Sequence, residues 1–287
     1  MPGAVDVLSG LPASPEEQAK RASLPEEPAE CMVVKALKRY QAQSGGPATL
    51  ERRIQQMDEA GVEKALVHGW KMFSYHNRLM MHETSVDDIG EALAKYPNRL
   101  YGMAGYNPFR IKQSLQDIRR AVNDYGFRGV MLHIYGFDMY LVDPRMYPLY
   151  ALCEELQIVV QMQVGHVLEA MPSKYGDPMQ LDEISLHFPG LKLVGCHTGF
   201  PWSDELISCC SKWDNIYYGL TSWMPKYISP ANVNYINSLG REKCVWGGPG
   251  GALKTAIEQI DQLGLRDDAK ENLLWKTATK VFNLDGA

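Results

Sequence analysis

The sequence lacks a long apolar run, a secretory signal and an excess of positive charge. No stretch approaches the roughly 18 consecutive apolar residues of a transmembrane helix, so no membrane partner is expected. The N-terminus shows no basic segment followed by an apolar one, so no secretory signal is expected. The formal net charge is -5 and the pI is about 5.8. Nucleic acids and anionic membranes select basic surfaces, so we expect neither as a partner.

Cysteine is also scarce. Six cysteines in 287 residues are too few for a disulfide scaffold, and no Cys-x-x-Cys pair occurs. We therefore expect reduced thiols and a cytoplasmic protein. A composition of 45% hydrophobic and 22% charged residues excludes disordered and fibrous classes. The length suits one large α/β barrel or two smaller domains.

Short apolar runs recur along the chain, each bounded by glycine, proline or polar residues. Their length and flanks are typical of strands that are buried on both faces of a parallel sheet. We expect eight such strands, at residues 4–8, 64–68, 100–105, 129–133, 158–163, 192–197, 216–220 and 244–247.

Amphipathic segments with recognisable helix ends lie between these runs. Thr49 is placed to cap a helix that Gly61 ends, and Ser85 is placed before the next one. Eight alternations of strand and helix predict one α/β domain over residues 1–287, a (β/α)8 or TIM barrel. A doubly wound open sheet is the competing fold, but no Gly-x-Gly-x-x-Gly motif follows the first strand. Further helices are expected at residues 111–125, 144–156, 253–263 and 267–282, and from residue 203 onward.

Residues 11–48 interrupt the alternation between the first strand and its helix. The segment contains two patches rich in proline and glutamate, and an apolar stretch at 32–40 that is expected to be helical. In a barrel this connection leaves the carboxyl end of a strand, where insertions form lids. The segment is therefore either a lid over the site, or a surface excursion or dimer contact.

Histidines gather where the predicted strands end. Active sites of (β/α)8 barrels lie at the carboxyl ends of the strands, so these positions are candidates for chemistry. The other histidines of the chain lie in predicted loops or helices. Four of the seven fall at or just beyond strand ends, namely His68, His133, His166 and His197.

Four segments carry a shared pattern. They are MDEAGVEKA from Met57, FRGVMLH from Phe127, VGCHTGFPW from Val194, and ENLLW from Glu271 followed by Val281-Phe282. Together they resemble the amidohydrolase-related family, in the branch that contains metal-dependent aromatic decarboxylases and related hydratases and lactonases. The resemblance covers nearly all of the chain from residue 50 onward and implies an amidohydrolase-like barrel. It says less about the reaction, because one fold hosts many chemistries.

The resemblance implies a divalent metal held by a His-x-His pair on the first strand, a histidine on the fifth and an aspartate on the eighth. At the matching positions this chain has Leu8, Gly10, Gln163 and Pro249. Leucine, glycine and proline have no side-chain lone pair to give to a metal, and an amide is a poor substitute for imidazole. Because all four ligands are lost together, we expect a site without a metal, and we expect no other cofactor.

One group of the family site is retained. His197 stands where the family has its catalytic histidine on the sixth strand, and a histidine suits acid–base catalysis near neutrality. We expect His197 to be the acid–base group, with His133 and Gln163 orienting or polarising the substrate. Gln161 and Gln163 are two residues apart, so both side chains point into the predicted barrel. They are expected to hold a substrate carbonyl or carboxylate, or to bond each other.

Aromatic side chains near the strand ends suit an apolar or aromatic substrate. Ordinary packing at the barrel rim is the alternative for each of them. The predicted substrate-binding residues are Gln161, His68, His166, Trp70, Tyr106, Tyr135, Trp202 and Trp223.

A site without a metal favours reactions that need only proton transfer and substrate orientation. We expect a lyase, isomerase or cyclase, decarboxylation and dehydration included. Its small-molecule substrate is expected to be largely apolar and carboxylated or polyketide-like, as in specialised biosynthesis. The family resemblance also implies a homodimer.

Three alternatives stay open. The first is a metal-dependent decarboxylase or hydrolase whose metal is held by His68, His133, His166 and His197. The second is a non-catalytic descendant that binds a ligand or a partner protein. The third is a phosphate-bearing substrate held at the glycine-rich residues 247–251.

Overall fold

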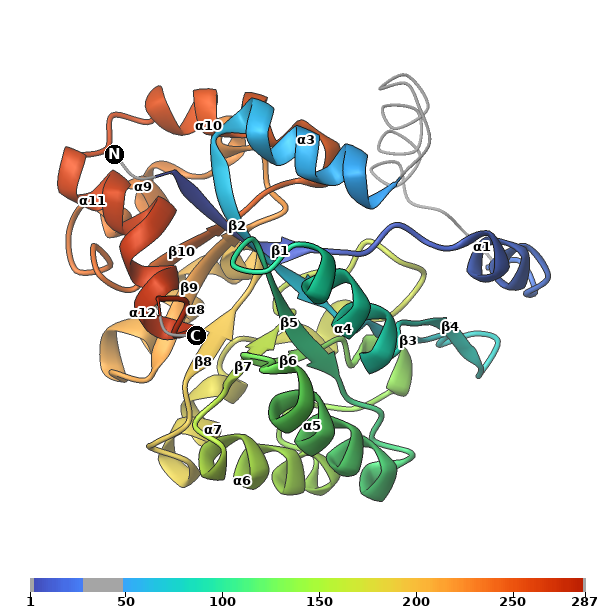
Figure 1. Cartoon of the computed structure of the whole chain (residues 1–287). Coiled ribbons are helices and arrows are strands. Elements are labelled where there is room, and N and C mark those ends of the chain that lie inside the picture. Colours follow the sequence, from blue (N-terminus) through green and yellow to red (C-terminus); the bar gives the residue numbers. More distant parts are fainter. Residues whose placement is uncertain (1–2, 28–48, 286–287) are drawn as a thin grey trace.

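Eight parallel strands form one sheet in chain order and curve into a nearly closed barrel (Figure 1). The structure is a computed structural model that describes residues 3–27 and 49–285. All eight strands expected from the sequence are present, and the TIM barrel is confirmed. The strands are β1 (Ala4–Ser9), β2 (Val62–His68), β5 (Leu100–Gly105), β6 (Gly129–Leu132), β7 (Val159–Met162), β8 (Leu193–Gly195), β9 (Ile216–Thr221) and β10 (Cys244–Gly247).

Helices cover the outside of the barrel (Figure 1). Thr49 accepts a hydrogen bond from the amide of Arg52 and caps α3 (Leu50–Ala60), which ends at Gly61 with a φ of 69°. That left-handed conformation suits glycine, as the sequence predicts. Ser85 caps α4 (Val86–Lys95) in the same way. The other helices around the barrel are α5 (Ile111–Tyr125), α6 (Tyr147–Glu155), α7 (Gln180–His187), α8 (Ser203–Lys212), α9 (Pro230–Asn237) and α10 (Leu253–Asp261).

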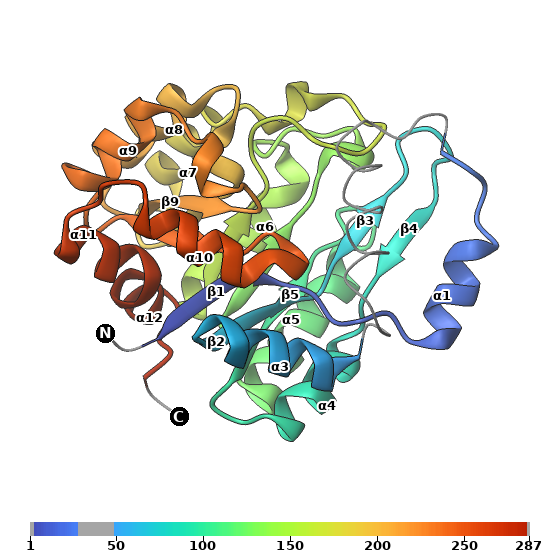
Figure 2. The same ribbon diagram turned by 90° about the horizontal axis from the view of Figure 1, so that it is seen from above.

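The C-terminal segment packs across the amino-terminal end of the barrel, near the N-terminus (Figure 2). It runs as α11 (Asp267–Glu271), a π-helical turn (Asn272–Lys276) and α12 (Thr277–Val281). Val281 and Phe282 join the apolar cluster inside the barrel, and the hydroxyl of Tyr101 donates to the carbonyl of Leu284 at 2.9 Å. This end of the barrel is therefore filled, and the site lies at the carboxyl ends of the strands.

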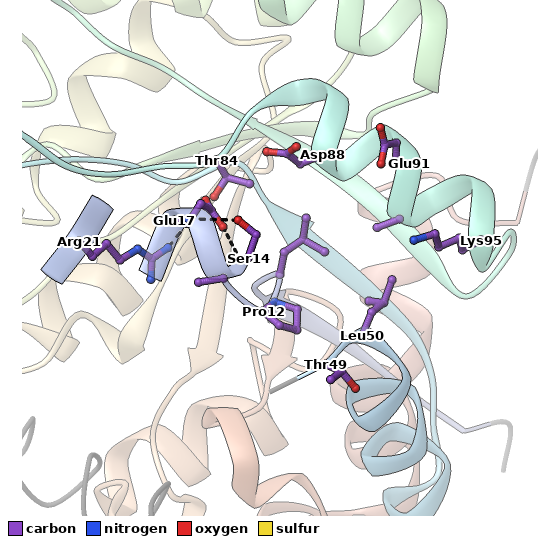
Figure 3. A pocket seen from close by; sticks show the side chains of 13 residues that line it. Pro12, Ser14, Glu17, Arg21, Thr49, Leu50, Thr84, Asp88, Glu91 and Lys95 are labelled. Carbon is purple, nitrogen blue, oxygen red and sulfur yellow. Dashed lines mark hydrogen bonds and ion pairs between the residues drawn. The ribbon is translucent and has the colours of Figure 1, made fainter. Parts of the chain in front are cut away.

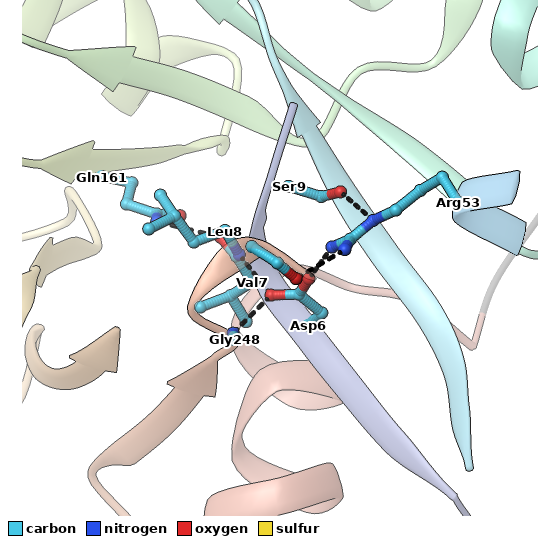
Figure 4. A network of polar contacts seen from close by, with 8 residues as sticks. Asp6, Val7, Leu8, Ser9, Arg53, Gln161 and Gly248 are labelled. Carbon is cyan, nitrogen blue, oxygen red and sulfur yellow. Dashed lines mark hydrogen bonds and ion pairs between the residues drawn. The ribbon is translucent and has the colours of Figure 1, made fainter. Parts of the chain in front are cut away.

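A buried ion pair spans the seam between the first and last strands, which contact each other without a backbone ladder in the described sheet. Asp6 of β1 is fully buried and accepts hydrogen bonds from the amides of Leu8 at 3.0 Å and Gly248 at 2.8 Å (Figure 4). Arg53 of α3 donates to Asp6 at 2.5 Å, and also to the Oγ of Ser9. The network ties β1, α3 and the loop after β10 together.

An antiparallel hairpin outside the barrel was not expected from the sequence. Its strands are β3 (Lys71–Phe73) and β4 (Met80–Glu83), so His82 lies in a strand and not in the predicted loop or helix start. Strands of three and four residues are too short to show a clear alternation in the sequence.

Part of the insertion at 11–48 lies beside this hairpin. Its helix α1 (Pro15–Ala22) begins after the capping residue Ser14 and lies outside the barrel on the β4 side (Figure 2). After α1, the carbonyls of Pro25 and Glu26 accept hydrogen bonds from Asn77 in the hairpin turn. The apolar stretch at 32–40 lies outside the described residues, and so does Cys31. The lid stays a prediction.

The described part of the chain contains no helix that is long and apolar enough to cross a membrane. Its cysteines are Cys153, Cys196, Cys209, Cys210 and Cys244, all of which are free and buried. Burial raises the pKa of Cys196 to about 12, so this thiol is not a nucleophile near neutrality.

Candidate active site

A cavity of about 300 Å³ opens at the carboxyl ends of the strands. It is bounded by loops that follow strands from around the barrel, as is usual for this fold. Six of the predicted site residues line it, namely His133, Gln163, His166, His197, Trp70 and Trp223. The other lining residues are Leu8, Met72, Leu168, Glu169 and Ser222.

His197 follows β8 in a short 3-10 turn, with a φ of 58°. Its amide donates to the Oγ1 of Thr221 at 2.7 Å, and its Nδ1 lies 3.2 Å from the Thr221 carbonyl. The Oγ1 of Thr221 also lies 3.1 Å from Nδ1. Because the carbonyl oxygen only accepts, the tautomer that satisfies it has the ring proton on Nδ1 and the lone pair on Nε2, and we assign that tautomer. Burial lowers the pKa of His197 to about 4, so the ring is neutral at pH 7. The Nε2 of His197 is therefore unprotonated at neutral pH and can accept a proton.

His133 follows β6 and faces Glu169, which lies in the loop after β7. The Nε2 of His133 is 3.8 Å from the Oε2 of Glu169, and the histidine side chain is almost fully buried. Burial, the largest single effect, raises the pKa of Glu169, but His133, the Glu169 backbone amide and His197 together lower it below its usual range. Glu169 thus places a negative charge beside the cavity.

Glu169 was not among the predicted site residues. A sequence signal for it exists, because it is an acidic residue in a loop that leaves the carboxyl end of a strand. That signal is weak, since many loops at this end of a barrel carry an acidic residue. Only its distance from His133 distinguishes Glu169 from the others.

Gln161 and Gln163 lie at different depths in the barrel. Gln161 is fully buried, and its Nε2 donates to the carbonyl of Val7 at 2.9 Å and to the Sγ of Cys196 at 3.2 Å. Gln163 lines the cavity above it. Gln161 therefore bonds the barrel wall and not Gln163, and it forms part of the floor beneath the site.

Four other predicted substrate-binding residues do not reach the cavity. The buried Tyr106 donates to the carbonyl of Arg145 at 2.6 Å, and the buried Tyr135 donates to the carbonyl of Gly165 at 3.0 Å. His68 is fully buried with its ring 5.5 Å from that of Trp70, and burial lowers its pKa to about 3. Trp202 is part-buried and is not among the residues that line the cavity.

The positions at which the resemblance implies metal ligands do not offer a ligand set here. Leu8 packs with Met131 and Cys196 in an apolar cluster, and Pro249 lies beyond the end of β10. Gly10 has no side chain, which leaves Gln163 as the one polar group of the four. Among the described residues no three His, Cys, Asp or Glu side chains are grouped to hold a metal ion. His68, His133, His166 and His197 are therefore not grouped as a ligand set in the described residues, and a metal held by them stays an untested alternative.

A hollow of about 340 Å³ lies away from the strand ends, between α1, the start of α3 and α4 (Figure 3). Charged side chains of both signs line it, and Arg21 lies 4.0 Å from Glu17. Its described lining includes no histidine or cysteine. None of the site residues predicted from the sequence lines it, and the chemistry is assigned to the cavity at the strand ends, where six of them meet.

The glycine-rich loop at 247–251 forms hydrogen bonds with other parts of the chain. The amide of Gly248 donates to Asp6, and the carbonyl of Gly250 accepts from Arg53. The anion that this loop binds is therefore the buried carboxylate of the chain, which argues against the alternative of a phosphate there.

Comparison with known proteins places the chain in a family. The amidohydrolase family model matches residues 39–284. An uncharacterized TIM-barrel protein from Bordetella bronchiseptica is similar over 99% of each chain, with 22% identity and a TM-score of 0.76. The 2,6-dihydroxybenzoate decarboxylase from Rhizobium is similar over 100% of each chain, with 14% identity and a TM-score of 0.72. For 5-carboxyvanillate decarboxylase from Sphingomonas paucimobilis the values are 99% of each chain, 17% and 0.70. The chain belongs to the amidohydrolase family.

Proposed function

We propose that this protein is a metal-independent acid–base lyase that acts on a small, largely apolar molecule with a carbonyl group. The observation that carries this proposal is the state of His197 on the cavity wall. The ring is neutral, its Nδ1 is held by the Thr221 carbonyl, and its Nε2 keeps a free lone pair. A general base needs this arrangement.

Each of the cavity residues has a different role in such a reaction. Nε2 of His197 removes a proton from the carbon next to the substrate carbonyl, and the electron pair moves toward the carbonyl oxygen. The amide of Gln163 donates a hydrogen bond to that oxygen and stabilises the negative charge that develops there. His133, which lies beside the Glu169 carboxylate, donates a proton to the departing group, so that a hydroxyl leaves as water.

The same first step serves the other reactions in the expected class. When the proton returns at another carbon, the result is an isomerisation. When the enolate attacks a second carbonyl of the same molecule, the result is a cyclisation. The choice depends on how the cavity orients the substrate.

The charge of the cavity lining favours a neutral substrate over a negatively charged one. Its described lining contains the Glu169 carboxylate but no lysine or arginine. A substrate carboxylate would meet that negative charge without a permanent cation to bind it. Of the two substrate types expected from the sequence, a neutral polyketide-like ketone therefore fits better than a carboxylate.

Decarboxylation of a small apolar acid is the second candidate. It is favoured by the similarity to two decarboxylases, at 14% and 17% identity. In that reaction His133 and His166, both on the cavity wall, would carry the positive charge that holds the substrate carboxylate.

A substrate panel distinguishes these candidates. It contains enolisable 1,3-diketones, aryl β-hydroxy ketones and hydroxybenzoates, and NMR in D2O follows deuterium uptake, loss of water and loss of CO2. We expect turnover of a ketone, and we expect His197→Asn to lower it by about 100-fold or more. The control is His187→Asn, which replaces an exposed histidine at the end of α7.

Two results would count against the proposal. Turnover of the ketone by His197→Asn at the wild-type rate removes His197 as the base. Tight binding of panel members without turnover, equal in both variants, favours the non-catalytic alternative.

A further inference from the structure

A second chamber adjoins the candidate active site. It has a volume of about 390 Å³ and lies between residues 21–27 and the β3–β4 hairpin. Trp70 and Met72 line both this outer chamber and the inner cavity that contains His197. We propose that the outer chamber binds an alkyl or aryl extension of the substrate, whose carbonyl end lies in the inner cavity. This inference rests on the proposed function and specifies its substrate class.

The lining of the outer chamber selects an apolar group. Besides Trp70 and Met72, its apolar lining residues are Leu24, Pro25, Leu79 and Met81, and Arg21, Glu27 and His82 also line it. Methionine side chains are unbranched and flexible, so they adapt to extensions of differing shape.

The polar residues at the edge of the outer chamber are already engaged. The Nη2 of Arg21 lies 3.4 Å from the Nε2 of His82, which also lies 3.2 Å from the Oγ1 of Thr84. Glu27 accepts a hydrogen bond from Asn77 through Oε1 at 3.1 Å, while its Oε2 is buried without a hydrogen-bond partner among the described residues. A ligand in this chamber is therefore held mainly by burial of apolar surface.

The size of the inner cavity supports a substrate in two parts. At about 300 Å³, it lies at the lower end of the roughly 300–1,000 Å³ found for ligand pockets. A compact reacting group fills such a space, and an extension needs a second one. Trp70 provides the connection, because its ring lies 6.4 Å from that of His133 and also faces the outer chamber.

Binding of a probe series tests the inference without any need for turnover. The probes are phenyl n-alkyl ketones from acetophenone to octanophenone, titrated into the full chain by isothermal calorimetry. Each methylene that enters the outer chamber should tighten binding by about fourfold, the value for a buried CH2. Met81→Gln should reduce this gain to less than about twofold per methylene, and acetophenone should bind as to the wild type.

The matched control is Met80→Gln on the same strand. Met80 does not line the chamber and packs against the main apolar core. It should keep the fourfold gain. Leu24→Gln, on the opposite wall, serves as the second test variant if thermal unfolding shows that Met81→Gln is not folded.

Three results would overturn the inference. They are a dissociation constant that does not change with chain length, an equal loss in the Met80 and Met81 variants, and no binding of any probe up to its solubility limit. A change in oligomeric state in Met81→Gln would instead assign the chamber to an interface between two copies. The turnover of His197→Asn is a separate readout, so failure of the acid–base role and failure of the chamber are distinguishable.

Discussion

The Nε2 of His133 lies 3.8 Å from the Oε2 of Glu169, across 36 positions of sequence, and both side chains face the cavity that His197 also lines. The cavity therefore holds two different kinds of histidine. One is neutral and bonded to a backbone carbonyl, and the other stands beside a carboxylate. Environments that differ in this way separate a base from an acid in one site.

The charge of Glu169 should matter more than its size. Glu169→Gln keeps the shape and removes the negative charge that lies 3.8 Å from the Nε2 of His133. We expect kcat for the reacting ketone to fall at least tenfold, about 1.4 kcal/mol of barrier, with KM little changed. Steady-state kinetics checks this, with Glu258→Gln on the exposed face of α10 as the control. Equal kinetics in the two variants would remove Glu169 from the mechanism.

The pH profile should report the unusual acidity of His197. Its pKa in the folded protein is about 4, below the usual 6.5, because burial disfavours the charged ring. The base form is therefore present throughout the window from pH 6.5 down to about 4. We expect kcat/KM to fall on the acid side with a midpoint near pH 4. An acid-side midpoint near 6.5 would show that the base is an unburied histidine.

The ion pair at the barrel seam should contribute strongly to stability. Arg53 is largely buried against the fully buried Asp6, whose pKa is raised by burial although Arg53 and the amides of Leu8 and Gly248 oppose this. Removing one partner of a buried pair costs about 3–5 kcal/mol. We expect Arg53→Met to lower the free energy of unfolding by about 3 kcal/mol, measured by urea denaturation.

Arg52 provides the control for that measurement. It directly precedes Arg53 in α3, and its ion pair with Glu59 is exposed to solvent. Arg52→Met should cost less than about 1 kcal/mol. Equal losses in the two variants would mean that the seam network stabilises the barrel no more than a surface pair does.

Removal of metal should leave turnover unchanged. The positions that correspond to the metal ligands of the family hold Leu8, Gly10, Gln163 and Pro249, which do not form a ligand set. We expect less than stoichiometric Zn, Mn, Fe, Co and Ni in untagged protein, and the same ketone turnover before and after chelation. One tightly bound ion per chain, with activity lost on chelation, would contradict this prediction and favour metal-assisted decarboxylation or hydrolysis.

Local patterns in the sequence are sufficient for most of the barrel. The eight strands follow from short apolar runs, and α3 follows from a cap at Thr49 and a stop at Gly61. These features depend on residues a few positions apart, so the sequence contains them directly. The motif around His197 likewise places a histidine at the end of β8 without any knowledge of its neighbours.

Contacts across the barrel are decided by the tertiary structure. Glu169 meets His133, and Asp6 meets Arg53 from 47 positions away, only after the strands have curved into a barrel. The same closure directs Tyr106 and Tyr135 to backbone carbonyls and away from the cavity. The sequence by itself thus determined the eight strands of the barrel, most of the helices around them and the place of His197 at a strand end. Only the folded chain decided which side chains face that histidine, because through-space distances between remote residues have no local signature.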